Sequence, residues 1–234
     1  MYFYHMHHEH HLKSSDTIKD IVIGMSDGLT VPFALAAGLS GAITSSGIVV
    51  TAGIAEIVAG SIAMGLGGFL AGKTEADHYN SELKREYEEV ERVPEQEKME
   101  VREVFAGFGI SEHLQHEIAN EMAKDKDAWV DFMMRYELGL EKPEANRARQ
   151  SAITIGLSYI VGGIIPLSPY FFIHDSQQAL YYSCAITSIC LFVFGYFKSK
   201  VTGQPPLSGA FKVLIIGALA AAAAFGMAKL INGG

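Results

Sequence analysis

The stretch Met25-Ser26-Asp27-Gly28-Leu29-Thr30-Val31-Pro32 places a carboxylate inside an apolar run that extends from Ile21 to about Ala42. A helix over these ~22 residues would be roughly 33 Å long, which is enough to cross a bilayer. A carboxylate at membrane depth costs at least ~2.5 kcal/mol unless it faces protein, water or an ion. The run therefore predicts a membrane-spanning helix in which Asp27 has a function.

Pro32 adds a second polar feature to this helix, because its nitrogen carries no hydrogen and cannot donate to the carbonyl of Gly28. The same turn also holds a thioether and two hydroxyls, those of Met25, Ser26 and Thr30. Carboxylates, carbonyls and thioethers are all ligands of cations. We therefore expect the helix to line a path for a metal cation, with Asp27 and Met25 on that path.

The composition is that of a helical membrane protein. Hydrophobic residues make up 49% of the chain and charged residues 19%, the mean hydropathy is +0.20, and the apolar residues come in blocks. Four more runs are long enough to span: Ile48 to about Ala71, Ile153 to Ile173, Leu180 to Phe197, and Phe211 to Ile231. The expected fold is an all-α membrane protein with five transmembrane helices, the third bent by Pro166 and Pro169.

The second apolar run carries a further carboxylate and thioether, Glu56 and Met64. Two intramembrane carboxylates are costly to retain without a task, so both are candidates for the transport path. The alternative is a structural hydrogen bond within the helix bundle. Gly24 and Gly28 form a small-xxx-small pair, which is compatible with ordinary helix packing or with a dimer interface.

An acidic segment separates the second and third runs. Residues 73–149 contain 20 Asp and Glu against 12 Lys and Arg, a net charge of −8, whereas the remainder of the chain is neutral. This distribution argues against a nucleic-acid partner and favours cation binding. The expected division is a His-rich tail (1–15), transmembrane helices 1 and 2 (16–73), a cytosolic helical metal-binding domain (74–145) and transmembrane helices 3 to 5 (146–234).

Helix signals divide the acidic segment into four pieces. The second span continues as a charged helix from Lys73 to about Val93, where Pro94 breaks it. Three short helices are then predicted, with Ser111 as an N-cap and with Gly107, Gly109 and Gly139 at helix ends: Glu95–Phe108, Glu112 to about Ala123, and about Asp127 to Leu138.

Acidic and thioether side chains recur at helical spacing in this segment, and residues three or four apart share one helix face. The candidate metal ligands are Glu86, Glu89, Glu97, Glu100, Met133, Met134 and Glu137. Carboxylates alone suit Ca²⁺ or Mg²⁺, whereas thioethers shift the preference to Fe²⁺, Co²⁺, Ni²⁺ or Zn²⁺. The alternative is a solvated acidic face with the two methionines in the core.

Three other groups of residues are weaker metal-site candidates. One is a His/carboxylate set on a single predicted helix, formed by Glu112, His113, His116 and Glu117. A second lies where the second span leaves the membrane and could form a pore mouth: Glu75, Asp77 and His78. The third is the His-rich N-terminus, whose alternative interpretation is a disordered tail. Simple solvation is the alternative for the first two groups.

The basic residues predict the topology. Most lysines and arginines outside the acidic segment, together with those that flank it, fall on one side of the membrane: Lys13, Lys19, Lys73, Arg147, Arg149, Lys198, Lys200 and Lys212. The turns at 41–47 and 174–178 contain neither residue type. By the positive-inside rule, the N-terminus and the acidic segment are cytosolic and the C-terminus lies on the far side.

Two sequence blocks, together with the Glu-rich insert, resemble the vacuolar iron transporter family of plants and yeast. The blocks are Ser26-Asp27-Gly28-Leu29-Thr30-Val31-Pro32-Phe33-Ala34-Leu35 and Gly60-Ser61-Ile62-Ala63-Met64-Gly65-Leu66-Gly67-Gly68, the second leading to Glu75-Ala76-Asp77-His78-Tyr79. The resemblance covers the chain from about residue 14 onward.

The resemblance implies a five-span homodimer in the vacuolar membrane that exchanges cytosolic Fe²⁺, and often Mn²⁺ or other divalent ions, for protons. It implies an ion path lined by the first two spans, with Asp27, Glu56 and Met64 on it. It also implies metal binding by the seven insert residues named above. No enzymatic activity or prosthetic group is expected, because the insert lacks, at the matching places, the Glu-x-x-His helices of the related ferritin-like domains. An uncoupled metal channel, a ferroxidase-like protein and a membrane scaffold remain alternatives.

Overall fold

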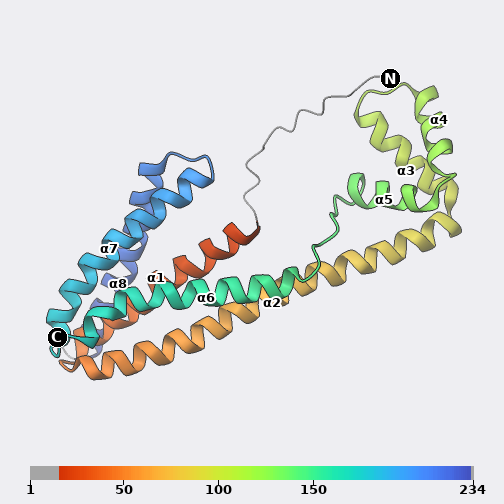
Figure 1. The fold of residues 1–234 in the computed structure, drawn as a ribbon. Helices are drawn as coiled ribbons and strands as arrows, with labels where there is room; N and C mark the ends of the chain where they lie inside the picture. Colours follow the sequence, from red (N-terminus) through yellow and green to blue (C-terminus); the bar gives the residue numbers. More distant parts are fainter. Residues whose placement is uncertain (1–15, 233–234) are drawn as a thin grey trace, which may run out of the picture. The chain divides into compact units, whose positions relative to one another are not determined.

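The computed structural model describes residues 16–232, and the His-rich tail lies outside these described residues (Figure 1). The chain forms two units. Unit 1 contains the described residues up to Phe69 and from Arg149 onward, and unit 2 contains Leu70–Ala148. Within the described residues the structure is helical, with one isolated β-bridge between loops.

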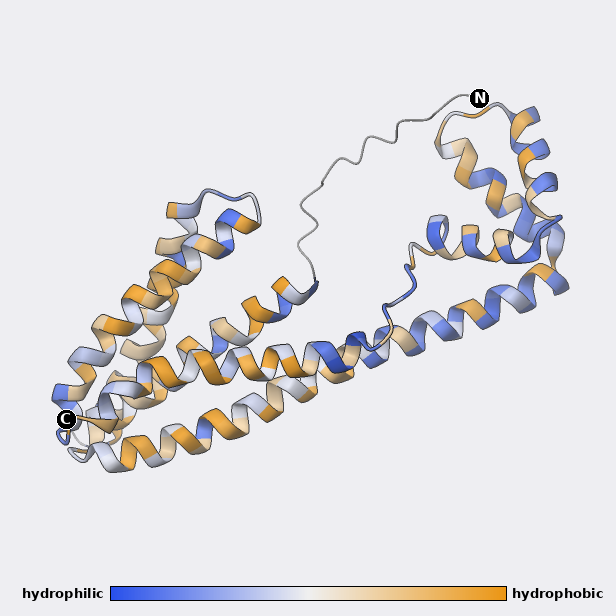
Figure 2. Cartoon of the chain, in the orientation of Figure 1, coloured by the Kyte–Doolittle hydropathy of each residue, from blue (hydrophilic) through white to orange (hydrophobic). Residues whose placement is uncertain are grey.

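Within residues 16–232, five helices are long and apolar enough to cross a membrane, which confirms the predicted number of spans. They are α1 (Asp16–Ala42), α2 (Ser46–Arg92), α6 (Arg147–Leu167, continued by the 3₁₀ turn Ser168–Phe171), α7 (Ser176–Val201) and α8 (Pro206–Ile231). Figure 2 shows these helices rich in apolar residues, except for the second half of α2, which is hydrophilic. The charged continuation of the second span is therefore also confirmed.

Helices α1 and α6 pack through glycines with almost no side chain between them. A Cβ atom built on Gly28 would lie 2.3 Å from the backbone oxygen of Tyr159, and one built on Gly24 would lie 2.3 Å from that of Ile155. From the other helix, a Cβ on Gly162 would lie 2.9 Å from the nitrogen of Leu29. The small-xxx-small pair of α1 thus serves packing inside the chain.

We expect Gly28→Ala to destabilise the protein by about 1–3 kcal/mol, because the new methyl group meets backbone that cannot rotate away. The measurement is thermal unfolding of the full-length protein in detergent. Gly226→Ala is the matched control, since nothing lies within 4 Å of a Cβ at that position of α8. Equal melting temperatures for the two variants would contradict the close packing of α1 against α6.

The α1–α2 loop and the α6–α7 loop meet at one end of unit 1. Ser45 and Asp175 form the isolated bridge, the Ser46 amide donates to the His174 carbonyl at 3.1 Å, and the Ser176 amide donates to the Thr44 carbonyl at 2.9 Å. Within unit 1, Figure 1 shows the end of α6 and the start of α7 beside the turn from α1 to α2. Both loops that lack lysine and arginine therefore lie at the same end of this unit.

Unit 2 consists of the second half of α2 with α3 (Pro94–Gly107), α4 (Glu112–Met122) and α5 (Lys126–Tyr136), which confirms the three predicted short helices. Pro94 occupies the first turn of α3, where a missing amide hydrogen costs nothing. Ser111 precedes α4 as predicted, but its side chain makes no capping hydrogen bond. By contrast, Asp125 caps α5 by accepting from the Ala128 amide.

Candidate metal-binding and transport sites

Two of the predicted ligands in unit 2 are deeply buried carboxylates. Glu86 on α2 is 1% exposed and Glu97 on α3 is 2% exposed. In each residue, the Oε2 atom is buried without a hydrogen-bond partner among the described residues. Burying a carboxylate oxygen without a partner is costly, so these two atoms are natural points of attachment for a cation or a proton.

Burial also changes the protonation of these two groups. Desolvation, followed by the negative charge of Glu137, raises the pKa of Glu86 from 4.5 to about 7. Desolvation, followed by the charge of Glu100, raises the pKa of Glu97 from 4.5 to about 7. The pKa of Glu137 is raised as well, chiefly by desolvation and next by Glu100. The carboxylates from three helices therefore lie close enough to repel one another, which is the condition that a divalent cation relieves.

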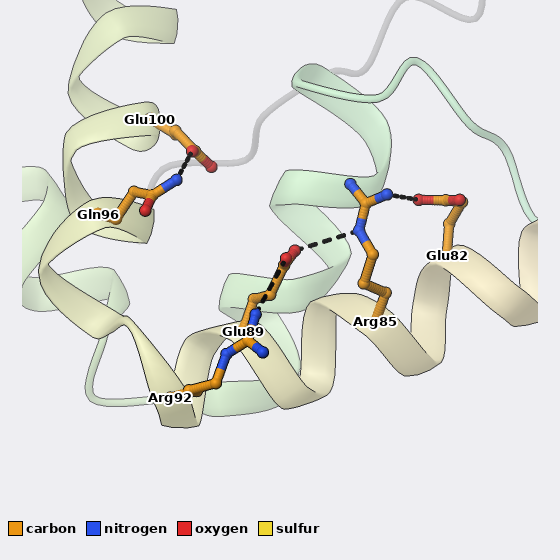
Figure 3. Close-up of polar contacts among 6 residues, drawn as sticks. All are labelled: Glu82, Arg85, Glu89, Arg92, Gln96 and Glu100. Carbon is orange, nitrogen blue, oxygen red and sulfur yellow. Dashed lines mark hydrogen bonds and ion pairs between the residues drawn. The ribbon is translucent and has the colours of Figure 1, made fainter.

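The other two predicted glutamates have partners in this structure (Figure 3). Glu89 is ion-paired with Arg85 at 3.2 Å and with Arg92 at 3.7 Å. Glu100 accepts a hydrogen bond from the amide of Gln96 at 3.1 Å. These contacts are partly exposed and exchange readily with solvent, so metal binding at Glu89 would require its arginine partners to move.

Met133 and Met134 on α5 are completely buried in the core of unit 2, beside Val101 and Trp129. Core packing thus accounts for both methionines, which was the alternative to a ligand role. Among residues 16–232, no three His, Cys, Asp or Glu side chains converge closely enough to hold an ion as the structure stands. The seven predicted ligands remain a proposal that requires side-chain rearrangement around Glu86 and Glu97.

The rival His/carboxylate set is divided between other contacts. The Arg102 guanidinium lies 2.9 Å and 3.2 Å from the two ring nitrogens of His116, and His113 pairs with Glu117 at 3.8 Å. A guanidinium at that distance competes with a metal for the same nitrogens. At the proposed pore mouth, Glu75, Asp77 and His78 are exposed, and Asp77 pairs with Lys73 at 2.5 Å.

In unit 1, Glu56 is held by a residue of α6. The Tyr159 hydroxyl donates a short hydrogen bond to Oε1 of Glu56, while Oε2 is buried without a partner among the described residues. A Cβ on Gly60, one turn after Glu56, would lie 2.4 Å from the Tyr159 hydroxyl oxygen. Because Gly60 has no side chain, the Tyr159 hydroxyl can approach α2 closely enough to bond Glu56.

Glu56 also lines an open groove of about 560 Å³ in unit 1. The groove is bordered by Thr30, Val31 and Ala34 of α1 and by an alanine row of α8 that includes Ala224. Asp27 precedes these α1 residues by three, four and seven positions, so it shares their helix face. The two intramembrane carboxylates thus belong to one side of the helical unit.

The remaining residues of the predicted path are partly buried. Met25 on α1 and Met64 on α2 are both of intermediate exposure, as is Asp27. The Thr30 hydroxyl donates to the Ser26 carbonyl at 2.8 Å, and this bond leaves the lone pairs of the hydroxyl oxygen available to a cation.

The sequence interpretation missed two polar residues of unit 1. Tyr159 gave a usable signal, because a tyrosine in the middle of an apolar run needs a partner for its hydroxyl. Asp20 is 3% exposed and accepts from the Ser151 hydroxyl at 3.1 Å. It gave no signal, since the polar residues before the first apolar run have the composition of a solvated helix start.

We expect Tyr159→Phe to lower the rate of metal uptake about tenfold, because second-shell hydrogen bonds fix the orientation of a ligand. The measurement is uptake into proteoliposomes at several metal concentrations and pH values. Tyr182→Phe, at an exposed position of α7, is the matched control. The pH dependence of uptake should shift only in the first variant, and identical profiles would show that Tyr159 merely fills space.

The chain is similar to known proteins along most of its length. The model of the VIT family matches residues 18–229. Vacuolar iron transporter 1 of Tulipa gesneriana is 54% identical over 226 residues, which cover 97% of this chain and 92% of the relative. Vacuolar iron transporter 1 of Arabidopsis thaliana is 55% identical, with coverage of 97% and 90%. Protein CCC1 of Saccharomyces cerevisiae is 39% identical, with coverage of 92% and 69%. With the match to the family model spanning nearly every described helix, this chain belongs to the VIT family.

Proposed function

We propose that this protein moves Fe²⁺ from the cytosol into the vacuole in exchange for protons, and that it accepts other divalent transition metals such as Mn²⁺, Co²⁺, Ni²⁺ and Zn²⁺. The similar proteins of tulip and Arabidopsis carry the name vacuolar iron transporter. The observation that carries the proposal is the Glu56 carboxylate. It lies within unit 1, with one oxygen accepting from Tyr159 and the other without a hydrogen-bond partner among residues 16–232.

The proposed exchange takes place at the carboxylate oxygens of Asp27 and Glu56. A divalent ion is bound by the ionised forms of Asp27 and Glu56, with the thioethers of Met25 and Met64 favouring soft first-row ions. A proton occupies the same oxygens, so protons and metal compete for them. Metal wins near neutral pH and is released where the pH is low. The exchange of one for the other couples metal entry to proton return.

The role proposed for unit 2 is to capture metal from a dilute cytosolic pool. Its support is the buried pair Glu86 and Glu97, which repel each other and the nearby exposed Glu137. The full proposed ligand set adds the partnered glutamates and the core methionines: Glu89, Glu100, Met133 and Met134. Arg85 and Arg92 form ion pairs with Glu89, so a metal ion that binds Glu89 would have to displace them.

The proposed topology places the N-terminus and unit 2 in the cytosol and the C-terminus in the vacuolar lumen. Its support is the positive-inside rule together with the meeting of the two loops that lack lysine and arginine. A homodimer is the proposed assembly, as the resemblance implies. Protease added outside intact vacuoles tests this orientation, and we expect it to cleave unit 2. Protection of unit 2 from that protease would mean that the orientation is reversed.

Uptake of Fe²⁺ into proteoliposomes tests the function and separates it from a channel. We expect uptake to accelerate when the interior is made more acidic than the medium, since luminal protons then drive exchange. Empty liposomes and Asp27→Ala protein are the controls. Uptake at the same rate with and without the pH gradient would identify an uncoupled channel, and oxygen consumption with Fe²⁺ would identify a ferroxidase.

A further inference from the structure

A pocket of about 380 Å³ lies in unit 1 where the α1–α2 and α6–α7 loops meet. Its lining combines polar groups with apolar walls and includes Ser46, His174, Val50, Phe171 and Ile173. None of the residues assigned to metal transport lines it. The pocket therefore needs an explanation of its own.

The N-terminus of α2 opens beside this pocket with unsatisfied donors. The Ser46 amide is satisfied by the His174 carbonyl at 3.1 Å. The amides of Gly47 and Ile48 have no acceptor among the described residues, as expected for the first turn of an uncapped helix. The neighbouring helix α7 differs, because Asp175 caps it by accepting from the Gln178 amide at 2.7 Å.

The side chain of Ser46 is a second observation, separate from the helix N-terminus, that indicates a bound ligand. Its side chain lines the pocket, the residue is only 2% exposed, and its hydroxyl oxygen has no hydrogen-bond partner in the described part of the chain. A serine at the start of a helix normally uses this hydroxyl as a cap or gives it to solvent. A buried, unpaired hydroxyl beside two free amides is a set of donors without an acceptor.

From these groups we infer that the pocket binds a phosphate group, donated by inorganic phosphate or by the headgroup of an anionic lipid. Helix N-termini attract such anions through free amides and the helix dipole. Ser46 and the His174 imidazole add two side-chain donors. The walls formed by Val50, Phe171 and Ile173 leave an apolar space next to the anion, which a lipid chain would fill. The carboxylate of Asp175, the residue after His174, accepts a hydrogen bond from the Gln178 amide at the start of α7.

Binding to the full-length protein in detergent tests the inference with two probes. Inorganic phosphate is titrated by calorimetry against chloride at equal ionic strength. Phosphatidic acid is tested by native mass spectrometry and by thermal unfolding in nanodiscs, with phosphatidylcholine as the reference. Binding of phosphate identifies the free ion as a ligand, and binding of phosphatidic acid alone identifies the lipid headgroup.

Ser46→Ala and His174→Leu should each weaken binding of the probe about tenfold, because each removes one hydrogen-bond donor to a charged group. Thr51→Val is the matched control, since this hydroxyl belongs to the same helix end but lines a neighbouring hollow. Size-exclusion profiles and Fe²⁺ uptake report on folding independently. The inference is overturned if neither probe binds the wild-type protein, or if Thr51→Val weakens binding as much as the two pocket variants do.

Discussion

Asp27→Ala is expected to reduce Fe²⁺ uptake at least about 100-fold while leaving the protein folded. Even outer-shell partners of a metal ligand cost about 10–100-fold when they are lost, and Asp27 is proposed to contact the ion itself. Asp27 is partly exposed on the helix face that leads into the groove, and no described residue gives it a hydrogen bond. Removing the Asp27 carboxylate therefore leaves no buried hydrogen-bond donor without its acceptor, and we expect the variant to fold.

The measurement is initial uptake of Fe²⁺ into proteoliposomes that contain equal amounts of folded protein. Asp16→Ala is the matched control, because it removes a carboxylate from the exposed start of the same helix. Asp27→Glu should retain part of the activity, since a carboxylate remains. If Asp27→Ala transports at the wild-type rate, the proposed path through unit 1 is wrong.

Metal binding by unit 2 is expected to weaken about 10- to 100-fold for each pH unit below about 7. The pKa values of Glu86 and Glu97 are raised from 4.5 to about 7, so both carboxyls are protonated below that pH and metal must displace their protons. Glu89, Glu100 and Glu137 raise these values further by repulsion, whereas Arg85 opposes the shift at Glu86. For the metal-free protein the sign is opposite. Stability should rise as the pH falls through 7, because protonation removes the cost of two buried charges.

Calorimetric titration of the full-length protein with Co²⁺ between pH 7.5 and 5.5 measures the effect, since Co²⁺ does not oxidise under these conditions. The double variant Glu86→Gln/Glu97→Gln should bind weakly at every pH and lose the steep pH dependence. Glu88→Gln, at an exposed position of the same helix, should behave as wild type. A pH profile that is unchanged in the double variant would exclude these two carboxylates as ligands.

The helices could be predicted from the sequence because their causes are local. Apolar runs set the five spans, Pro94 breaks α2 from α3, and Gly109 and Gly139 take the positive φ values of 75° and 64° that glycine tolerates after a helix end. The two prolines of the third span, Pro166 and Pro169, were expected to bend it, and the structure has a 3₁₀ turn, Ser168–Phe171, directly after α6. The capping of α4 was less predictable, since Ser111 stands at the correct position but makes no capping bond.

Contacts between distant residues could not be predicted in this way. The bond from Tyr159 to Glu56 joins residues 103 positions apart and depends on the close approach that glycines permit. By contrast, the pairing of Glu89 with Arg85 and Arg92 is local, at four and three positions along one helix, and could have been predicted from the spacing. It was missed because the prediction considered the acidic residues only as metal ligands. Helical spacing states which side chains share a face, but the packing decides which of them are buried, paired or free.

The most direct test of the account is to record the luminal pH of proteoliposomes, through an enclosed pH-sensitive dye, while Fe²⁺ enters a mildly acidic lumen. Exchange of metal for protons predicts that the lumen becomes more alkaline in proportion to the Fe²⁺ taken up, and that both signals disappear together in Asp27→Ala. Fe²⁺ entry with no change of luminal pH, or a proton flux that persists in that variant, would contradict exchange at shared carboxylates.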